Sequence, residues 1–183
     1  SMIFIENNNG GSGGTMGNWY IFNNTFNKTN TDAPGGSGIV AVMAPSGFFL
    51  NNTVVNAGGT GDYAWSSFNA YGGATGWTVQ NNIFYGGEYQ LTIQAPASVN
   101  ANKNLYYGAV GGSPWVYHST FTGSFSTWQS ACSCDSGSST GNPLLNSDLT
   151  IGVGSAASTL GADLSGLNIT PLNSDKVGTA RPS

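Results

Sequence analysis

The chain has 183 residues, of which 39% are hydrophobic and only 7% are charged, and its formal net charge is −4. Lys and Arg together number four, so the chain lacks the basic patch that nucleic-acid binding needs, and nucleic acid is not expected as a partner. No apolar run approaches the roughly 20 residues of a membrane-spanning helix, so no membrane span is expected either. The hydrophobic content is that of a folded domain with its own core.

A short phrase recurs along the chain and predicts short, stacked β-strands. Its copies read YIFNNTF at 20–26, FFLNNTV at 48–54, TVQNNIF at 78–84 and, in degenerate form, NANKNLY at 100–106. The second asparagine of the phrase falls at positions 24, 52, 82 and 104, with spacings of 28, 30 and 22 residues. Repeats of this length, with strands this short, are typical of the coils of a parallel solenoid.

A second phrase precedes the last three copies of the first. It covers residues 39–45, 66–71 and 90–96, and its alanines fall at positions 44, 70 and 95. Each repeat therefore contains two or three short strands separated by glycine-rich turns.

Alignment of the copies predicts which side chains face the core. The column of Ile21, Phe49, Val79 and Ala101 is apolar throughout, so it is expected to face inward. Two residues later the column ends at Lys103, which an apolar core would not hold unpaired, so this column faces out or lies at a bend.

The next column is asparagine in every copy, at positions 24, 52, 82 and 104. Parallel strands bring these residues within roughly 4.8 Å of one another, so their amides are expected to be buried and to form a hydrogen-bonded ladder. Asparagine also tolerates the left-handed backbone conformation that a tight bend needs.

The repeated pattern, apolar-x-x-Asn-x-apolar, resembles that of the right-handed parallel β-helix superfamily, the pectate-lyase-like fold. The segment that follows the last coil in many secreted members is similar to residues 125–129, 135–138, 142–145, 154–157, 161–163 and 175–182. The chain departs from the usual pattern at Ala156, which replaces a proline, and at Ala157. The resemblance implies an all-β fold, a right-handed single-stranded parallel β-helix, with coils in residues 1–128. It further implies an irregular C-terminal tail, residues 129–183, that packs on or caps the helix, and an extracellular or cell-surface location.

Three of the eight carboxylates occupy similar places in successive repeats. Asp32, Asp62 and Glu88 follow the ladder asparagine of their repeat by eight, ten and six residues. Because a solenoid projects equivalent loops from one side, these carboxylates are expected to lie close together. They are candidate catalytic residues, as acid and base in glycoside hydrolysis, or ligands of a Ca²⁺ ion that binds a uronate. The alternative is three polar turn residues on a solvated rim.

Lys28, Tyr63 and Trp65 belong to the same loops and are candidate substrate-binding residues, the two aromatic rings as surfaces on which sugars stack. A polysaccharide is therefore the expected partner, and the activity, if there is one, is that of a polysaccharide lyase or a glycoside hydrolase. Asn30-Thr31-Asp32 matches a short motif of polygalacturonases, but the other elements of that family are missing, so that activity is not expected. The other class that stays open is a structural or adhesive solenoid without chemistry of its own, including a fragment of a longer protein.

The cysteines and the first strand lead to further expectations. Cys132 and Cys134 are one residue apart, where a bridge would be strained, so they are expected to be free thiols or loop residues. Residues 3–5 begin a strand with almost no chain before it to cover it, so the first coil is expected to be uncapped and to support self-association. No metal site is expected from the cysteines, since His118 is the only histidine.

Overall fold

The computed structural model describes residues 3–6, 18–28, 38–56, 66–174 and 178–180, and in these the fold is mostly β. The strands are β1 (Ile3–Ile5), β2 (Trp19–Phe22), β3 (Thr25–Lys28), β4 (Val40–Val42), β5 (Ser46–Leu50), β6 (Thr53–Asn56), β7 (Ser66–Ala70), β8 (Gly76–Gln80), β9 (Ile83–Gly86), β10 (Tyr89–Ile93), β11 (Val99–Asn102), β12 (Leu105–Tyr107), β13 (Trp115–Tyr117) and β14 (Thr120–Thr122). The helices are α1 (Phe125–Cys132) and the 3₁₀ turns η2 (Ala156–Thr159), η3 (Ser165–Leu167) and η4 (Thr170–Asn173).

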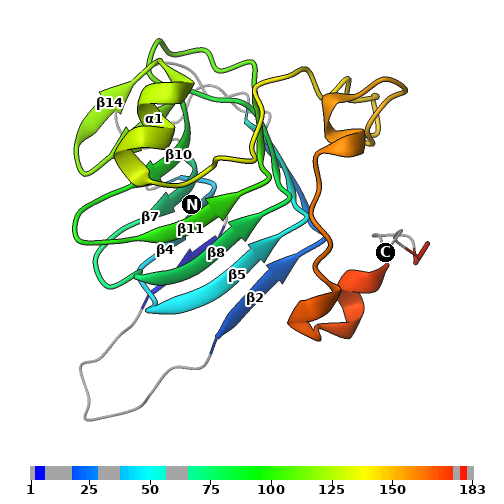
Figure 1. Ribbon diagram of the computed structural model, residues 1–183, viewed down its shortest axis with the longest axis horizontal. Coiled ribbons are helices and arrows are strands. Elements are labelled where there is room, and N and C mark those ends of the chain that lie inside the picture. The colour runs from blue at the N-terminus through cyan, green and yellow to red at the C-terminus, as the bar shows by residue number, and fades with distance from the viewer. Residues whose placement is uncertain (1–2, 7–17, 29–37, 57–65, 175–177, 181–183) are drawn as a thin grey trace.

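The described strands form three sheets that the chain visits in turn. Sheet A has the order β1-β4-β7-β10-β13-β14, sheet B the order β11-β8-β5-β2, and sheet C the order β12-β9-β6-β3. The chain thus runs from sheet A to sheet B to sheet C and returns to sheet A, and neighbouring strands are parallel except for the antiparallel pair β13–β14 (Figure 1). The expectation of a mostly β fold, with residues 20–26 and 48–54 in parallel pairing, is confirmed.

The register of sheet B agrees with the column predicted to face inward. Ile21 pairs with Phe49, Phe49 with Val79, and Val79 with Ala101. All four are buried, with exposures of 7, 0, 0 and 1%. The repeat phrase therefore identified one wall of the core.

The second phrase also forms stacked strands, but its alanines do not share a column. In sheet A, Val42 pairs with Ala70 and Ala70 with Ile93. Ala95 lies two residues beyond Ile93, in the turn after β10, because the register follows the residues that face the core and not residue identity.

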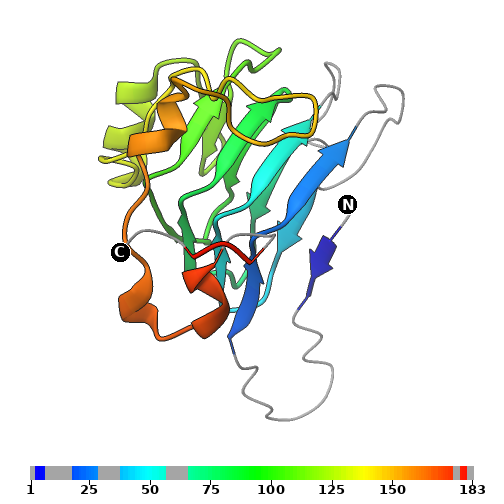
Figure 2. The same cartoon turned by 90° about the vertical axis from the view of Figure 1, so that its right-hand side faces the viewer.

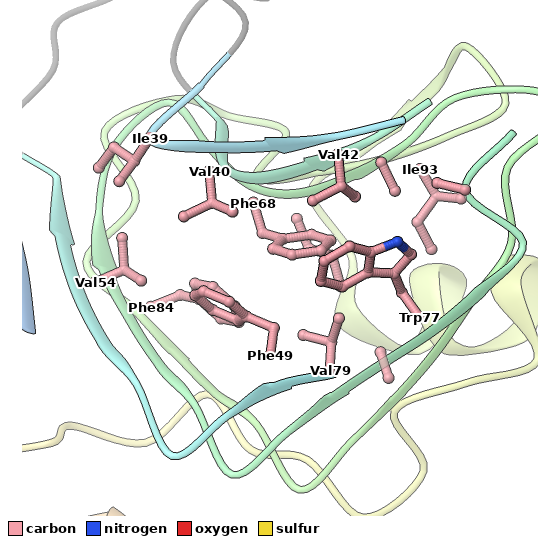
Figure 3. Close-up of a cluster of buried hydrophobic side chains, with 14 of the residues drawn as sticks. Ile39, Val40, Val42, Phe49, Val54, Phe68, Trp77, Val79, Phe84 and Ile93 are labelled. Atoms are coloured by element: carbon pink, nitrogen blue, oxygen red, sulfur yellow. The ribbon is translucent and has the colours of Figure 1, made fainter. Parts of the chain in front are cut away.

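Aromatic and aliphatic side chains from all three sheets fill the space between them (Figure 3). The ring of Phe49 lies 5.0 Å from that of Phe68 and 6.3 Å from that of Phe84, measured between ring centroids. The buried Trp77 donates from its indole nitrogen to the carbonyl of Ala44 at 2.8 Å. Gly47, on the adjacent strand, makes room for this indole, since a Cβ there would lie 2.6 Å from the ring.

The bend between sheets B and C lies at the column that ends in Lys103. Asn23, Asn51, Asn81 and Lys103 have φ angles of 57, 54, 58 and 56°, which is the left-handed conformation. The expectation that this column lies at a bend is confirmed. The left-handed backbone belongs to this column and not to the ladder asparagines that follow it, so that part of the prediction is wrong.

The asparagine ladder is present, and its bonds repeat from strand to strand. The side-chain nitrogens of Asn24, Asn52 and Asn82 donate to the side-chain oxygen of the next asparagine at 3.1, 3.2 and 3.0 Å. Asn52, Asn82 and Asn104 are at most 1% exposed, as predicted. Asn24 is exposed, against the prediction, because in the described residues β2 and β3 have a neighbouring strand on one side only.

Helix α1 covers the end of the core beside β13 and β14 (Figure 1). Phe125 lies 5.2 Å from Trp115 between ring centroids, and Trp128 is fully buried. Ser124 caps the helix by accepting a hydrogen bond from the backbone nitrogen of Thr127. The helix spans the boundary at 128 and 129, and the division into coils and tail at that point stays a prediction.

The later part of the chain runs along the bend between sheets B and C (Figure 2). The side chain of Asn23 donates to the carbonyls of Pro171 and Ser174 at 3.2 and 2.9 Å. Asn81 donates to the carbonyl of Ala162 and accepts from its backbone nitrogen, at 2.8 and 2.9 Å. The two bend asparagines therefore hold this segment against the sheets.

Cys132 and Cys134 form a disulfide, so the expectation of free thiols is wrong. Their Cα atoms are 5.1 Å apart, within the usual range for a bridge. Ser133 between them has a left-handed backbone with φ of 51°, which brings the two side chains to the same side. Among the described residues, no helix combines the length and the apolar character needed to cross a membrane.

Candidate functional site

The predicted loop face lies where the chain leaves sheet C for sheet A. Lys28 ends β3, and Glu88 follows the last residue of β9, Gly86, by two positions. The register of sheet C pairs Lys28 with Asn56 and Asn56 with Gly86, so Lys28 and Glu88 belong to the same edge. Two strand spacings, roughly 10 Å, separate Lys28 from Gly86.

The other predicted site residues, Asp32, Asp62, Tyr63 and Trp65, lie outside the described residues. The convergence of the three carboxylates and the stacking role of the two aromatic rings therefore stay predictions.

Both described residues of this face are half-buried. Burial lowers the pKa of Lys28. Glu88 packs against the following turn, since a Cβ at Gly111 would lie 2.8 Å from its Cγ. Close by, the buried Gln90 donates to the carbonyls of Phe84, Gly86 and Tyr107 at 3.2, 3.3 and 2.8 Å. The amide of Gln90 thus closes the corner between sheets C and A, a structural role that the sequence did not reveal.

Metal ligation has no support from side-chain clustering in the described segments. There, His, Cys, Asp and Glu form no group of three that could hold an ion. A Ca²⁺ site formed with Asp32 and Asp62 stays a prediction.

The outer face of sheet B shows a second arrangement, one that crosses its four strands. Tyr20, Phe48, Thr78 and Asn100 lie side by side in register and point outward, opposite in alternation to the core column. The rings of Tyr20 and Phe48 stack with centroids 5.2 Å apart and planes 11° apart. The row thus changes from aromatic on β2 and β5 to hydroxyl and amide on β8 and β11.

A shallow groove opens at the polar end of this row. Its lining includes Thr75, Gly76, Thr78, Ser98, Asn100 and Ser133. Gly76 pairs with Ser46 and has no side chain, so only its backbone contributes to the lining. None of the described residues that line the groove is charged.

The walls of the groove are fixed by hydrogen bonds and by the disulfide. Ser98 donates from its hydroxyl to the carbonyl of Thr75 at 3.0 Å, which ties together two turns that enter sheet B. On the other side, the backbone nitrogen of Asp135 donates to the carbonyl of Ala101 at 2.7 Å. That bond holds the segment with Ser133 and the disulfide beside β11.

The repeat phrase itself carries a signal for this outward row. Tyr20, Phe48, Thr78 and Asn100 are the first residues of the four copies of the repeat phrase. Once Ile21 and its column are assigned to the core, strand alternation places the preceding residue on the outer surface. The groove itself depends on Ser133, more than 30 residues later than Asn100, and no repeat predicts that contact.

Comparison of the chain with protein-family models, with curated proteins and with solved structures found no match.

Proposed function

We propose that this chain is a right-handed single-stranded parallel β-helix of the pectate-lyase-like type and that it binds an extracellular polysaccharide. Support for the architecture comes from the repeated order of sheets A, B and C and from the asparagine ladder at one bend of each pass. The location at the cell surface or outside the cell follows from the resemblance of the repeats and belongs to the proposal.

The observation that supports binding is the groove on the outer face of sheet B. Hydroxyl and amide groups supply both donors and acceptors, which is what the hydroxyls of a sugar require. Thr78 and Asn100 are adjacent in register, and each offers such a group on the outward side. A polymer that crosses the strands would meet equivalent positions at intervals of roughly 4.8 Å.

Affinity electrophoresis through gels that contain soluble polysaccharides tests the proposal. We expect at least one polymer to retard the protein relative to a gel without polysaccharide. A protein that migrates at the same rate in every gel, across neutral and acidic polymers, would contradict polysaccharide binding.

The predicted loop face supports a second, catalytic form of the same function. Asp32, Asp62 and Glu88, with Lys28, Tyr63 and Trp65, would form a lyase or hydrolase site, with Ca²⁺ as a cofactor of the lyase. The test is incubation with uronate polymers, with and without Ca²⁺, followed by measurement of unsaturated ends and of reducing ends. Activity that is lost when all three carboxylates are replaced by amides would support the site, and activity unchanged in that variant would contradict it.

The structural or adhesive alternative is favoured by a different observation, the exposure of the first strands. Phe4, Trp19 and Tyr20 are 48, 41 and 50% exposed, and the amide of Asn24 is exposed beside them. In this proposal a second copy covers that surface. Light scattering over a range of concentrations tests it: a dimer that the Trp19→Ser and Tyr20→Ser double variant loses is expected, whereas a monomer at every concentration would rule it out.

A further inference from the structure

We infer that the groove on the outer face of sheet B takes a neutral glycan chain, held through its hydroxyl groups and lying across β8 and β11. The inference rests on the proposed polysaccharide binding and adds the place and the class of sugar.

The charge of the groove and of the chain favours a neutral ligand. The described residues of the groove offer hydroxyls, an amide and backbone, and none of them is a Lys or Arg that could neutralise a carboxylate or sulfate. The whole chain has eight acidic and four basic residues, so an acidic polymer would approach a surface of its own sign. A neutral glycan meets no such repulsion.

The polar groups of the groove are available to a ligand. Within the part of the chain that the structure describes, the side chains of Thr78 and Asn100 make no hydrogen bond to another residue, and Asn100 is exposed. A hydroxyl can donate one hydrogen bond and accept two, and an amide can donate two and accept two. Side by side on adjacent strands, they offer mixed donors and acceptors to the hydroxyls of a sugar ring.

Trp77 is the one aromatic residue among the described residues that line the groove. The indole of Trp77 points into the core, where its nitrogen is bonded to the carbonyl of Ala44, and only its strand segment reaches the groove. The outward rings of Tyr20 and Phe48 in the same row stack on each other, and neither residue is among those that line the groove. The glycan is therefore recognised by hydrogen bonds, and its affinity depends on Thr78 and Asn100.

The groove is also held in shape before a ligand arrives. Ser133 is fixed between the two bonded cysteines, and the next residues are tied to β11 through Asp135 and Ala101. A rigid wall lowers the entropy lost on binding, which matters most for a site that depends on few contacts.

Affinity electrophoresis with named probes tests the inference. The neutral probes are hydroxyethyl cellulose, xyloglucan and galactomannan, and the acidic probe is polygalacturonate. We expect retardation by at least one neutral polymer and none by polygalacturonate. In the Thr78→Val and Asn100→Ala double variant, the apparent affinity for that polymer should fall about tenfold. Each change removes an outward polar group and leaves the strand in place.

The matched control is the Thr25→Val and Asn27→Ala double variant, which makes the same kinds of change at exposed outward positions of sheet C. The control should bind as the unchanged protein does, and near-ultraviolet circular dichroism should show the same fold for all three proteins. If the Thr78 and Asn100 variant still binds neutral polymer, the groove is not the binding site. Binding of polygalacturonate alone would overturn the neutral class but leave polysaccharide binding intact, and retardation by no polymer would overturn both.

Discussion

The carboxylate of Asp135 accepts a hydrogen bond from the side-chain amide of Asn104 at 3.2 Å, and the asparagine ladder therefore ends on a buried acidic group. The hydroxyl of Tyr106 and the indole nitrogen of Trp128 donate to the same carboxylate at 2.8 Å each, and the hydroxyl of Ser138 donates at 2.5 Å. Four donors replace the water that burial removes from this group. Along the ladder, each amide nitrogen points toward Asp135, so the amide dipoles are aligned with it.

Replacement of this carboxylate should destabilise the fold strongly. In Asp135→Ala the four donors lose their shared acceptor while they stay buried, so we expect a loss of about 3–5 kcal/mol in the free energy of unfolding. Urea denaturation followed by tryptophan fluorescence measures it. Asp148→Ala, at an exposed turn, is the control and should change the value by only about 0.5 kcal/mol. Equal losses in the two variants would contradict the role of Asp135.

The ladder predicts a contrast between its buried and exposed members. In Asn52→Leu the bonds to Asn82 and to the carbonyl of Ile21 are lost in the interior, so we expect a cost of about 1–3 kcal/mol. Asn24→Leu removes similar bonds at an exposed position, where water replaces them, and should cost less than about 1 kcal/mol. Urea denaturation of both variants decides the matter, and the prediction fails if Asn24→Leu is the more damaging change.

Tyr106, at the end of the ladder, should make the stability of the fold depend on pH in the alkaline range. Burial and the neighbouring Asp135 carboxylate raise the pKa of Tyr106 well above its usual value. A raised pKa in the folded state means that the folded protein holds this proton more tightly than the unfolded chain does. Stability from this group is therefore fully present below the unfolded pKa of about 10 and falls as the pH rises above it.

Urea denaturation midpoints measured from pH 8 upward should therefore decline above about pH 10. Tyr106→Phe removes the titrating group, and its midpoint should start lower but decline less steeply. Tyr20→Phe, at an exposed ring, is the control and should keep the slope of the unchanged protein. A Tyr106→Phe slope as steep as that of the unchanged protein would show that other groups cause the decline.

The repeat phrase predicted those parts of the fold that depend on strand alternation. The inward column of Ile21 and the ladder of Asn52 both follow from the sequence, because stacked strands bring equivalent residues together. The Cys132–Cys134 bridge was missed because it depends on the left-handed backbone of Ser133, which residue spacing does not reveal.

For a similar reason, only one part of the candidate groove could be predicted from the sequence. The outward row from Tyr20 to Asn100 is encoded in the repeat, whereas the wall at Ser133 comes from a segment that follows α1 and returns to β11. Such a return is set by buried contacts, above all those of Trp128 and Asp135, that have no periodic signature.

The disulfide should contribute to both stability and ligand binding. It closes a loop of three residues, for which chain entropy predicts a stabilisation of about 1–2 kcal/mol. Dithiothreitol, or the Cys132→Ser and Cys134→Ser double variant, should lower the free energy of unfolding by that amount.

Loss of the disulfide should also weaken retardation by neutral polysaccharide, because Ser133 would lose its fixed position at the groove. The double variant also serves as the control for the reductant, since dithiothreitol should have no effect on it. A reduced protein with unchanged stability and unchanged retardation would show that the hydrogen bond from Asp135 to Ala101 is enough to hold the wall.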